Sequence, residues 1–213
     1  MKKSALVTIL ALNWSTAMAE PVKFEGSAGS QPAGWLLTQT GRGQARWAVE
    51  ADASAPTGAL VLKQSGTADY PVALKRDSRI RNGAIEVTFK AIAGREDRAA
   101  GLVWRAIDAD NYYVVRANAL EDNVVLYKTV SGRRSPLEII GRKGGYGVNV
   151  PVPPGQWHTL RVAFTGNHFA VTFNGKPLFE VEDATFPEAG MVGLWTKADS
   201  VTAFDRLTID TKN

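Results

Sequence analysis

One stretch in the middle of the chain constrains the fold more than any other part of the sequence. Three segments rich in β-branched and aromatic residues follow one another at residues 101–107, 112–118 and 124–130. The stretches between them, 108–111 and 119–123, contain several Asp and Asn residues, whose side chains hydrogen-bond the local backbone and so favour turns. The pattern predicts two consecutive β-hairpins.

Alternation of side chains along these strands separates an apolar set from a polar set. If Ile107 pairs with Tyr112, the core-facing set is Leu102, Trp104, Ala106, Tyr113, Val115 and Ala117, joined by Val125 and Tyr127 from the third strand. The opposite set is Arg105, Tyr112, Arg116, Asn118 and Lys128. This polar set is either the ordinary solvated face of an antiparallel sheet or a ligand-binding surface.

Short β-rich segments continue along the rest of the chain, separated by Gly, Pro, Ser and Asp. The candidates are residues 45–50, 59–64, 71–75, 84–92 and 137–140. No segment shows a sustained helical period. Residues 143–155 contain several Gly and Pro, which predicts an extended loop that either rims a groove or crosses between sheets.

The last third predicts a series of hairpins. With Thr165 opposite His168, one face collects Leu160, Val162, Phe164, Phe169, Val171 and Phe173. A bulged or three-residue turn at residues 174–176 is expected, because it shifts parity so that Phe179 and Val181 are buried. With closing strands at 191–196 and 201–209, the sequence predicts a β-sandwich of about a dozen strands.

The amino terminus predicts export. Lys2 and Lys3 precede a mostly apolar run, and Ala17 to Ala19 has the small-x-small form of a signal-peptidase site, which predicts a signal peptide over 1–19. The apolar run is too short for a stable membrane span. The remaining residues, 20–213, are expected to form one domain in the periplasm or outside the cell. They contain no cysteine, so stability must come from the core.

Charge gives little sign of a nucleic-acid partner. The formal net charge is +4 and falls to +2 without Lys2 and Lys3, because 23 basic residues then face 21 acidic ones. The basic pairs Arg133-Arg134 and Arg142-Lys143 lie in Gly-, Ser- and Pro-containing stretches without a longer basic run. Nucleic-acid binding is therefore not predicted.

Several segments together resemble a known superfamily. They are GLVWRAIDADNYYVVRANALEDNVVLYK, the strand beginning at Trp157, HFAVTFNGKPLFEVED, and AGMVGLWTKADSVTAFDRLTI. This sequence resembles exported bacterial proteins of the concanavalin A-like lectin/glucanase superfamily, in particular laminin-G-like domains and 3-keto-disaccharide hydrolase domains grouped with family-16 glycoside hydrolases. The resemblance implies an all-β jelly-roll sandwich of two antiparallel sheets whose concave face meets carbohydrate in relatives.

The sequence supports a glycan-binding hypothesis. Arg105, Arg116 and Lys128 would donate to sugar hydroxyls or an acidic group, and Asn118 would donate and accept. Tyr112 and Trp195 would offer ring faces to a pyranose, although Trp195 is also a candidate for the core. Asp108, Asp110 and Asn111 form either a calcium site, which makes calcium the one candidate cofactor, or simply the polar turn of a hairpin.

Two other function classes remain open. In a hydrolase or lyase of the 3-keto-disaccharide type, a carboxylate such as Glu121 or Asp199 would act as base. The chain has no complete family-16 carboxylate motif, only the pair Glu180 and Glu182, so no catalytic residue is assigned. A carboxylate within reach of the basic cluster would favour the enzyme. A laminin-G-like module that binds a protein partner would instead show a flat, exposed apolar face.

Overall fold

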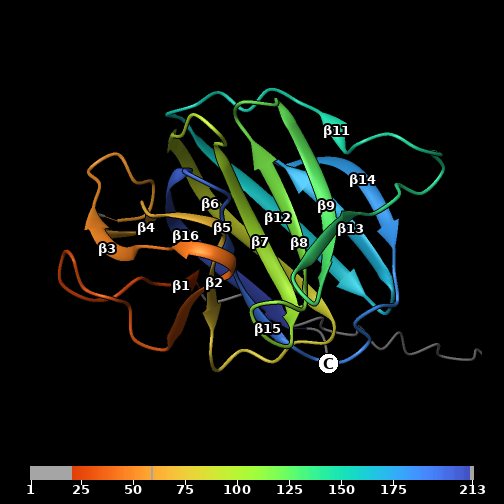
Figure 1. The fold of residues 1–213 in the computed structure, drawn as a ribbon, viewed down its shortest axis with the longest axis horizontal. Helices are drawn as coiled ribbons and strands as arrows, with labels where there is room; N and C mark the ends of the chain where they lie inside the picture. Colours follow the sequence, from red (N-terminus) through yellow and green to blue (C-terminus); the bar gives the residue numbers. More distant parts are fainter. Residues whose placement is uncertain (1–20, 59, 212–213) are drawn as a thin grey trace, which may run out of the picture.

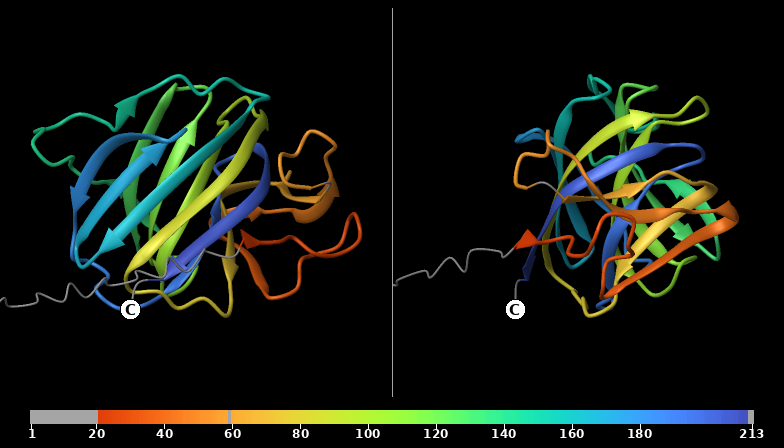
Figure 2. Two further views of the ribbon diagram at one scale, coloured as in Figure 1. Left: turned by 180° about the vertical axis from the view of Figure 1, so that it is seen from behind. Right: turned by 90° about the vertical axis from the view of Figure 1, so that its left-hand side faces the viewer.

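The computed structural model describes residues 21–58 and 60–211, and these residues form two antiparallel β-sheets packed face to face (Figures 1 and 2). Sheet A has the order β14-β13-β12-β6-β16-β4-β3, with β1 paired to β16. Sheet B has the order β10-β9-β8-β7-β15-β5-β2, with β11 paired to β9. The fold is the expected jelly-roll β-sandwich. The predicted signal peptide lies outside the described residues.

Figure 1 shows β7, β8 and β9 of sheet B in front of sheet A. The strands of sheet A are β1 (Pro21–Val22), β3 (Trp47–Ala51), β4 (Leu60–Gln64), β6 (Gly83–Ala93), β12 (Trp157–Thr165), β13 (His168–Phe173), β14 (Lys176–Glu182) and β16 (Val201–Thr211). The strands of sheet B are β2 (Trp35–Gln44), β5 (Thr67–Lys75), β7 (Ala99–Ala106), β8 (Tyr112–Asn118), β9 (Asn123–Val130), β10 (Arg133–Pro136), β11 (Val148–Asn149) and β15 (Met191–Trp195). No helix long and apolar enough to cross a bilayer occurs in this described part of the chain.

The main core lies between the two sheets. Sheet B contributes Leu102 and Trp104, and sheet A contributes Phe164 and Phe169, all at most 1 % exposed. The Trp104 ring stacks on Phe164 at a centroid distance of 6.0 Å and meets Phe169 edge-on at 5.3 Å. Packed aromatic rings of this kind supply large buried areas and hold the two sheets in one relative position.

The hairpins expected in the last third of the chain are confirmed. Thr165 pairs with His168, and this register puts the predicted alternating set of β12 and β13 into the core. Phe179 and Val181 are buried, as expected. The turn itself has two residues, Asn174 and Gly175, both with positive φ. The change of parity comes from a bulge at Leu178, where the pairing shifts between Val171 and Thr172.

The central strands β7 and β8 are also confirmed, but β9 presents the opposite face from the one predicted. Val124 and Leu126 enter the main core, whereas Val125 and Tyr127 lie on the other side of sheet B. The pairing of Asn118 with Asn123 produces this outcome, because a four-residue turn fixes the opposite parity. All four side chains are apolar or aromatic, so alternation alone did not distinguish the two faces.

A β-bulge also moves the predicted first hairpin. Trp104, rather than Ala106, pairs with Tyr113, and Arg105 has a positive φ of 48°. Beyond this residue the parity is reversed, so Ala106 lies on the outer side of sheet B instead of in the main core. Gly190 makes the bulge possible, because a Cβ there would lie 2.4 Å from the carbonyl carbon of Arg105.

The other predicted strands are confirmed with changed ends, except for residues 137–140, and one strand was missed. Residues 137–140 contain only an isolated bridge from Ile139 to Val181, while the preceding residues form β10. The long strand β2 was not predicted; it contains Gly41 and Gly43, both with positive φ, and its pairing with β5 is irregular there. Glycine inside a strand weakens the alternation on which the prediction depended.

Sheet B is strongly curved, with its outer face concave. Thr40 in β2 and Tyr112 in β8 share a hydrogen bond of 2.8 Å between their hydroxyl groups. Three strands separate β2 from β8, which corresponds to about 19 Å across a flat sheet. A threonine and a tyrosine cannot span that distance, so the two halves of the sheet must fold toward each other on the side away from sheet A.

Candidate functional site

The concave face of sheet B carries a second apolar layer. This layer consists of Val72, Leu74, Ala99, Val103, Ala106, Tyr112, Val114, Val125, Tyr127 and Trp195. All of these side chains are buried, although no second sheet covers them. Curvature and the side chains of the sheet edges therefore close most of this face, and polar groups reach it only at defined places.

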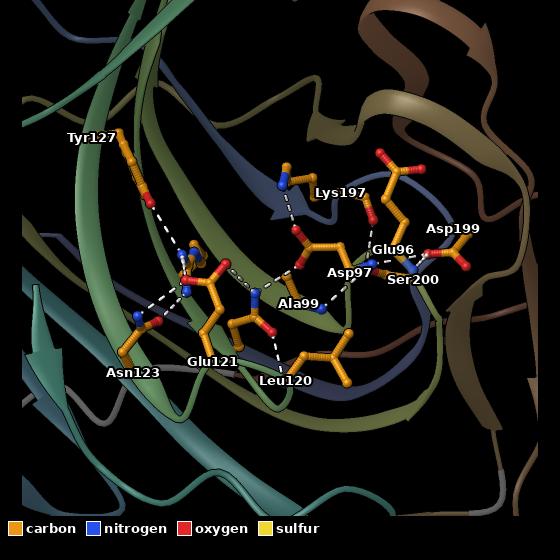
Figure 3. Close-up of polar contacts among 12 residues, drawn as sticks. Glu96, Asp97, Ala99, Leu120, Glu121, Asn123, Tyr127, Lys197, Asp199 and Ser200 are labelled. Carbon is orange, nitrogen blue, oxygen red and sulfur yellow. Dashed lines mark hydrogen bonds and ion pairs between the residues drawn. The ribbon is translucent and has the colours of Figure 1, made fainter. Parts of the chain in front are cut away.

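Eight polar residues meet at one end of the concave face, where β8 ends and β9 begins; Figure 3 labels Asp97, Glu121, Asn123, Tyr127 and Lys197 of this group. We call this group the Arg116 network. It contains Asp97, Arg116, Asn118, Glu121, Asn123, Tyr127, Tyr146 and Lys197. Five of these residues lie within one hairpin: Arg116 and Asn118 are in β8, Glu121 is in the turn, and Asn123 and Tyr127 are in β9. The fold adds the other three from distant loops.

Arg116 is the centre of this network. Its Nη2 donates to Glu121 Oε2 at 2.8 Å and to the hydroxyls of Tyr127 and Tyr146, each at 3.1 Å. Its Nη1 donates to the side-chain oxygen of Asn123. The Arg116 side chain is only 2 % exposed, so a buried charge of this kind requires the partners it has.

A second ion pair is linked to the first through Asn118. The Asn118 side-chain amide donates to Glu121 Oε1 at 3.0 Å and to Asp97 Oδ1 at 2.8 Å. Asp97 in turn accepts from Lys197 Nζ at 2.5 Å. These contacts join two loops to the end of β8, so each carboxylate is held in one orientation by several donors (Figure 3).

Exposure divides the network into supporting groups and accessible groups. The side chains of Arg116 and Asp97 are each 2 % exposed. Glu121, Lys197 and Tyr146 reach solvent. The Glu121 side chain is 38 % exposed, the Lys197 side chain is 28 % exposed, and Tyr146 is 45 % exposed. An incoming molecule therefore meets one carboxylate, one ammonium group and one phenol ring, held from behind by buried partners.

The electrostatics favour fixed charges over proton transfer. Partial burial alone would raise the pKa of Glu121, but the hydrogen bond and positive charge of Arg116 outweigh it and hold that pKa below its ordinary value. Burial raises the pKa of Tyr127, against the opposing charge of Arg116. At neutral pH, Glu121 is thus an ionised acceptor and Tyr127 a neutral hydroxyl group.

Arg134 of β10 lies over an aromatic platform in the middle of the concave face. We define this platform as Tyr70, Tyr127 and Trp195. The Arg134 guanidinium carbon lies 4.2 Å from the Tyr127 ring centroid, 4.9 Å from that of Tyr70 and 5.3 Å from that of Trp195. Tyr70 and Trp195 stack on each other at 5.6 Å.

A surface cavity of about 580 Å³ adjoins this platform. It shares Tyr70 with the platform and Lys197 with the Arg116 network. Glu96 and Gly132 contribute to its walls, together with residues 41–43 of β2 and 67–69 of β5. The cavity therefore adjoins both the Arg116 network and the aromatic platform. Its volume suits a small ligand or part of a longer ligand chain.

Four of the predicted ligand residues lie on the concave face. Asn118 and Arg116 belong to the Arg116 network. Tyr112 and Trp195 are each 0 % exposed. The Tyr112 hydroxyl bonds Thr40 at 2.8 Å and accepts from the Trp195 indole nitrogen at 3.3 Å. Their ring faces thus belong to the buried layer under the site.

The placement of Arg105 on this face was wrong. The bulge turns its side chain toward sheet A, where the guanidinium donates to the carbonyl oxygens of Arg81 at 2.8 Å, Phe186 at 3.0 Å and Gly166 at 2.5 Å. The guanidinium also lies 5.6 Å from the Phe169 ring centroid. Arg105 therefore joins three loops at the end of the sandwich.

The placement of Lys128 was wrong for a different reason. Lys128 pairs with Tyr113, so the parity of β9 directs it toward the rim between the sheets. Its Nζ donates to Asp183 Oδ2 at 2.7 Å and to Thr185 Oγ1 at 2.9 Å. Asp183 also accepts from the Tyr113 hydroxyl at 2.7 Å. These bonds attach the segment after β14 to sheet B.

The proposed calcium ligands serve the turn between β7 and β8. Asp108 Oδ1 accepts from the Asp110 backbone N–H at 2.8 Å and from the Asn111 amide at 2.9 Å. The Asn111 side-chain oxygen accepts from the Ser131 N–H at 2.9 Å. Within residues 21–58 and 60–211 no group of three or more His, Cys, Asp or Glu residues is placed to hold a metal ion. These contacts provide no positive support for calcium binding.

Asp199, a candidate base, is placed as a loop anchor. Its two carboxylate oxygens accept from the backbone N–H groups of Arg95 at 2.7 Å and of Glu96 and Asp97 at 3.0 Å each. Burial alone would raise the pKa of Asp199, but these bonds lower it. Asp199 thereby fixes the loop that carries Asp97.

The sequence reasoning did not connect several members of the site. Glu121 was considered only as a base and Arg134 only as part of a basic pair, and Asp97, Tyr146 and Lys197 were not considered. The spacing of Arg116, Asn118, Glu121 and Asn123 around one hairpin turn was a local signal that could have identified the first half of the network. No local pattern indicates the contacts that Asp97, Tyr146 and Lys197 make with it.

Comparison with known families agrees with this architecture. A family model described as a 3-keto-alpha-glucoside-1,2-lyase-like domain matches residues 24–210. The chain belongs to this family. The match spans β2 to β15, nearly all of β16 and every residue of the Arg116 network. No protein among the curated sequences matches the chain.

Solved structures of this family's fold include both binding modules and enzymes. The chain is similar to the carbohydrate-binding module CBM66 from Bacillus subtilis, with 19 % identity, 84 % of this chain and 96 % of that chain covered, and a TM-score of 0.65. It is also similar to LamAcat from Zobellia galactanivorans, with 10 % identity, 92 % of this chain and 98 % of that chain covered, and a TM-score of 0.58. A third similar structure is the β-glucanase of Bacillus licheniformis, with 13 % identity, 93 % and 100 % coverage and a TM-score of 0.55. These likenesses establish the jelly-roll fold.

Proposed function

We propose that this protein binds a saccharide on the concave face of sheet B, at the Arg116 network and the adjoining cavity. The observation that carries the proposal is the set of accessible groups at the network: an ionised carboxylate, an ammonium group and a phenol ring, each held by buried partners. Sugar hydroxyls donate and accept in fixed directions, and sugar rings pack on aromatic faces, so this set suits a saccharide.

Preorganisation adds to the argument. Glu121 receives three hydrogen bonds, from Arg116, Asn118 and Asn123, at 2.8 to 3.0 Å. A side chain that is already ordered loses little conformational entropy when a ligand arrives. Membership in a family described by a glucoside-cleaving reaction supports the same class of ligand, as does the similarity to a carbohydrate-binding module.

Binding to a panel of saccharides tests the proposal. Isothermal titration would compare neutral cello- and maltotetraose, their C6-carboxylate and 6-O-sulfate forms, and 3-keto glucosides. Glu121→Gln should weaken the affinity for the saccharide that binds most tightly about 10- to 100-fold, because hydrogen bonds to a charged group contribute about 1.5–3 kcal/mol.

Glu182→Gln is the matched control, because Glu182 is an exposed carboxylate on β14 of sheet A. It should leave the affinity unchanged. The absence of binding by every saccharide in the panel would overturn the proposal, as would equal affinities in the two variants.

A second candidate function is the elimination reaction named in the family description. The observation that favours it is a carboxylate, Glu121, within hydrogen-bond distance of the cationic Arg116. A base would remove the proton at C2 beside the 3-ketone, a C1–C2 double bond would form, and the aglycone would leave C1 with a proton. The lowered pKa of Glu121 opposes the role of base, since an efficient base titrates near the working pH.

The same samples distinguish the two candidates. An enone absorbs ultraviolet light, so its appearance on addition of a 3-keto glucoside reports elimination directly. Turnover that disappears in Glu121→Gln and persists in Glu182→Gln would establish the enzyme. Saturable binding without an enone would support the binding module.

A further inference from the structure

The charge balance of the concave face leaves one cation without a counterion. Arg116 is paired with Glu121, and Lys197 is paired with Asp97. Across residues 21–58 and 60–211, Arg134 makes no salt bridge within 4.0 Å and no hydrogen bond through its guanidinium group. Its Nη1 is buried without an acceptor. An arginine normally satisfies several of its five donors when it leaves bulk water.

The platform holds Arg134 in place but does not replace an acceptor. Rings attract the cation through their faces, and three such rings surround the guanidinium at 4.2 to 5.3 Å. The pairing of Arg134 with Thr129 sets its side chain on the concave face, whereas the neighbouring Arg133 is exposed. A planar guanidinium fixed in this way keeps unpaired N–H donors of the kind that a carboxylate or sulfate group accepts.

The adjoining cavity provides the space for the molecule that carries such an anion. Tyr70 belongs to both the platform and the cavity wall. The cavity also contains Lys197, whose charge is shared with Asp97, and the exposed carboxylate of Glu96. Glu96 repels an anion, and the wall's other cation, Arg42, lies 3.8 Å from the Asp69 carboxylate, so the unpaired Arg134 is the more favourable position for an anion.

We propose that the saccharide bound by this protein is acidic, and that Arg134 holds its carboxylate or sulfate group. This inference rests on the proposed saccharide-binding function and adds the chemical class of the ligand. The sugar ring would occupy the space beside Tyr70, and the anion would take the free donors of Arg134. A carboxylate and a sulfate ester share the chemistry that a guanidinium recognises.

The experiment compares ligands that differ only at C6. Kd values would be measured for cello- and maltotetraose, their C6-carboxylate forms and their 6-O-sulfate forms, each at low and high salt. The wild-type protein should bind an acidic form at least about 10-fold more tightly than the neutral form, and high salt should reduce this preference. Comparison of the Kd values of the C6-carboxylate and 6-O-sulfate forms identifies the preferred anion.

Three variants assign the preference to Arg134. Arg134→Gln should remove it, and Arg134→Lys should keep part of it, because the charge remains while the planar fork is lost. Arg133→Gln, the matched control on the exposed side of the same strand, should leave the preference intact. Thermal unfolding of each variant without ligand shows whether the fold is preserved.

The possible failures are distinguishable. Equal wild-type affinity for neutral and acidic forms would overturn the inference while leaving the proposed saccharide binding in place. An acidic preference that survives in a folded Arg134→Gln variant would also overturn it. The absence of binding by all six saccharides would overturn this inference, and the absence of binding by the 3-keto glucosides as well would also overturn the proposed saccharide binding.

Discussion

The outer faces of the two sheets differ, although both sheets consist of antiparallel strands. In sheet A, β13 alternates strictly between partly exposed and buried residues, so its outer face is solvated. In sheet B, every residue of β7 and β8 is buried. The comparison shows that alternation decides which residues face the main core, whereas curvature decides whether the other face meets water.

The largest expected effect tests whether the outer face of sheet B is a true interior. Val114 in β8 is 0 % exposed, and Val114→Asp would place an unpaired charge there. We expect a loss of at least about 4 kcal/mol in the free energy of unfolding. Thr172→Asp, on the outer face of sheet A beside Arg161, should cost less than about 1 kcal/mol. Similar urea midpoints for the two variants would remove the distinction.

A second prediction compares the two tryptophans of sheet B. Trp104 lies in the main core and Trp195 in the concave layer, and both are 0 % exposed. Trp195→Ala should cost about 3–5 kcal/mol, close to the effect of Trp104→Ala, because the truncation of either ring leaves a cavity. Chemical denaturation measures both. A cost below about 1 kcal/mol for Trp195→Ala would mean that the concave layer adds little stability.

A third prediction concerns the rim between the sheets and its dependence on pH. Burial would raise the pKa of Asp183, but the bonds from Lys128, Thr185 and Tyr113 hold that pKa below its ordinary value. A lowered folded-state pKa means that the stabilisation is present above the ordinary carboxyl pKa and is lost as the pH falls through the folded value.

Asp183→Asn should therefore cost about 1–3 kcal/mol at pH 7. The difference between the variant and the wild-type protein should shrink below about pH 4. Urea denaturation at several pH values measures this difference. A difference that stays constant down to acidic pH would show that the ionisation of Asp183 contributes nothing.

The smallest expected effect is on the outer face of sheet A. Arg161 is partly exposed there, between Glu86 and Thr172 on neighbouring strands. Arg161→Ala should change the free energy of unfolding by no more than about 0.5 kcal/mol, because surface charges contribute little. Thermal unfolding is a sufficient measurement. A large loss would indicate that this face is also part of a packed interior.

The fold could be predicted wherever alternation and turn chemistry agreed. In β12 and β13, aromatic and β-branched residues occupy one face only, and Gly166-Asn167 marks the turn, so one register satisfied both signals. In β9, Val124 and Leu126 on one face and Val125 and Tyr127 on the other are all apolar or aromatic, so alternation did not distinguish the faces and the turn length decided the parity. The bulge at Arg105 depends on a close approach of Gly190, which is far away in sequence.

The candidate site was predictable only in part. Arg116 and Asn118 were assigned to the correct face because they share parity within one strand. Arg105 and Lys128 were misplaced by a bulge and by a turn. Arg134 was not predicted to belong to the site, because its role follows from a platform built by β5, β9 and β15.

The sequence by itself determined the all-β class, the central hairpins, the face that each strand of the last hairpin series turns to the core, and the shared face of Arg116 and Asn118. These features depend on neighbours in the chain, for which side-chain period and turn residues are sufficient. The tertiary structure decided the curvature of sheet B, the closure of its outer face and the meeting of Arg134 with its platform. Those features arise because strands distant in sequence bend toward one another, and no local pattern records the distance between them.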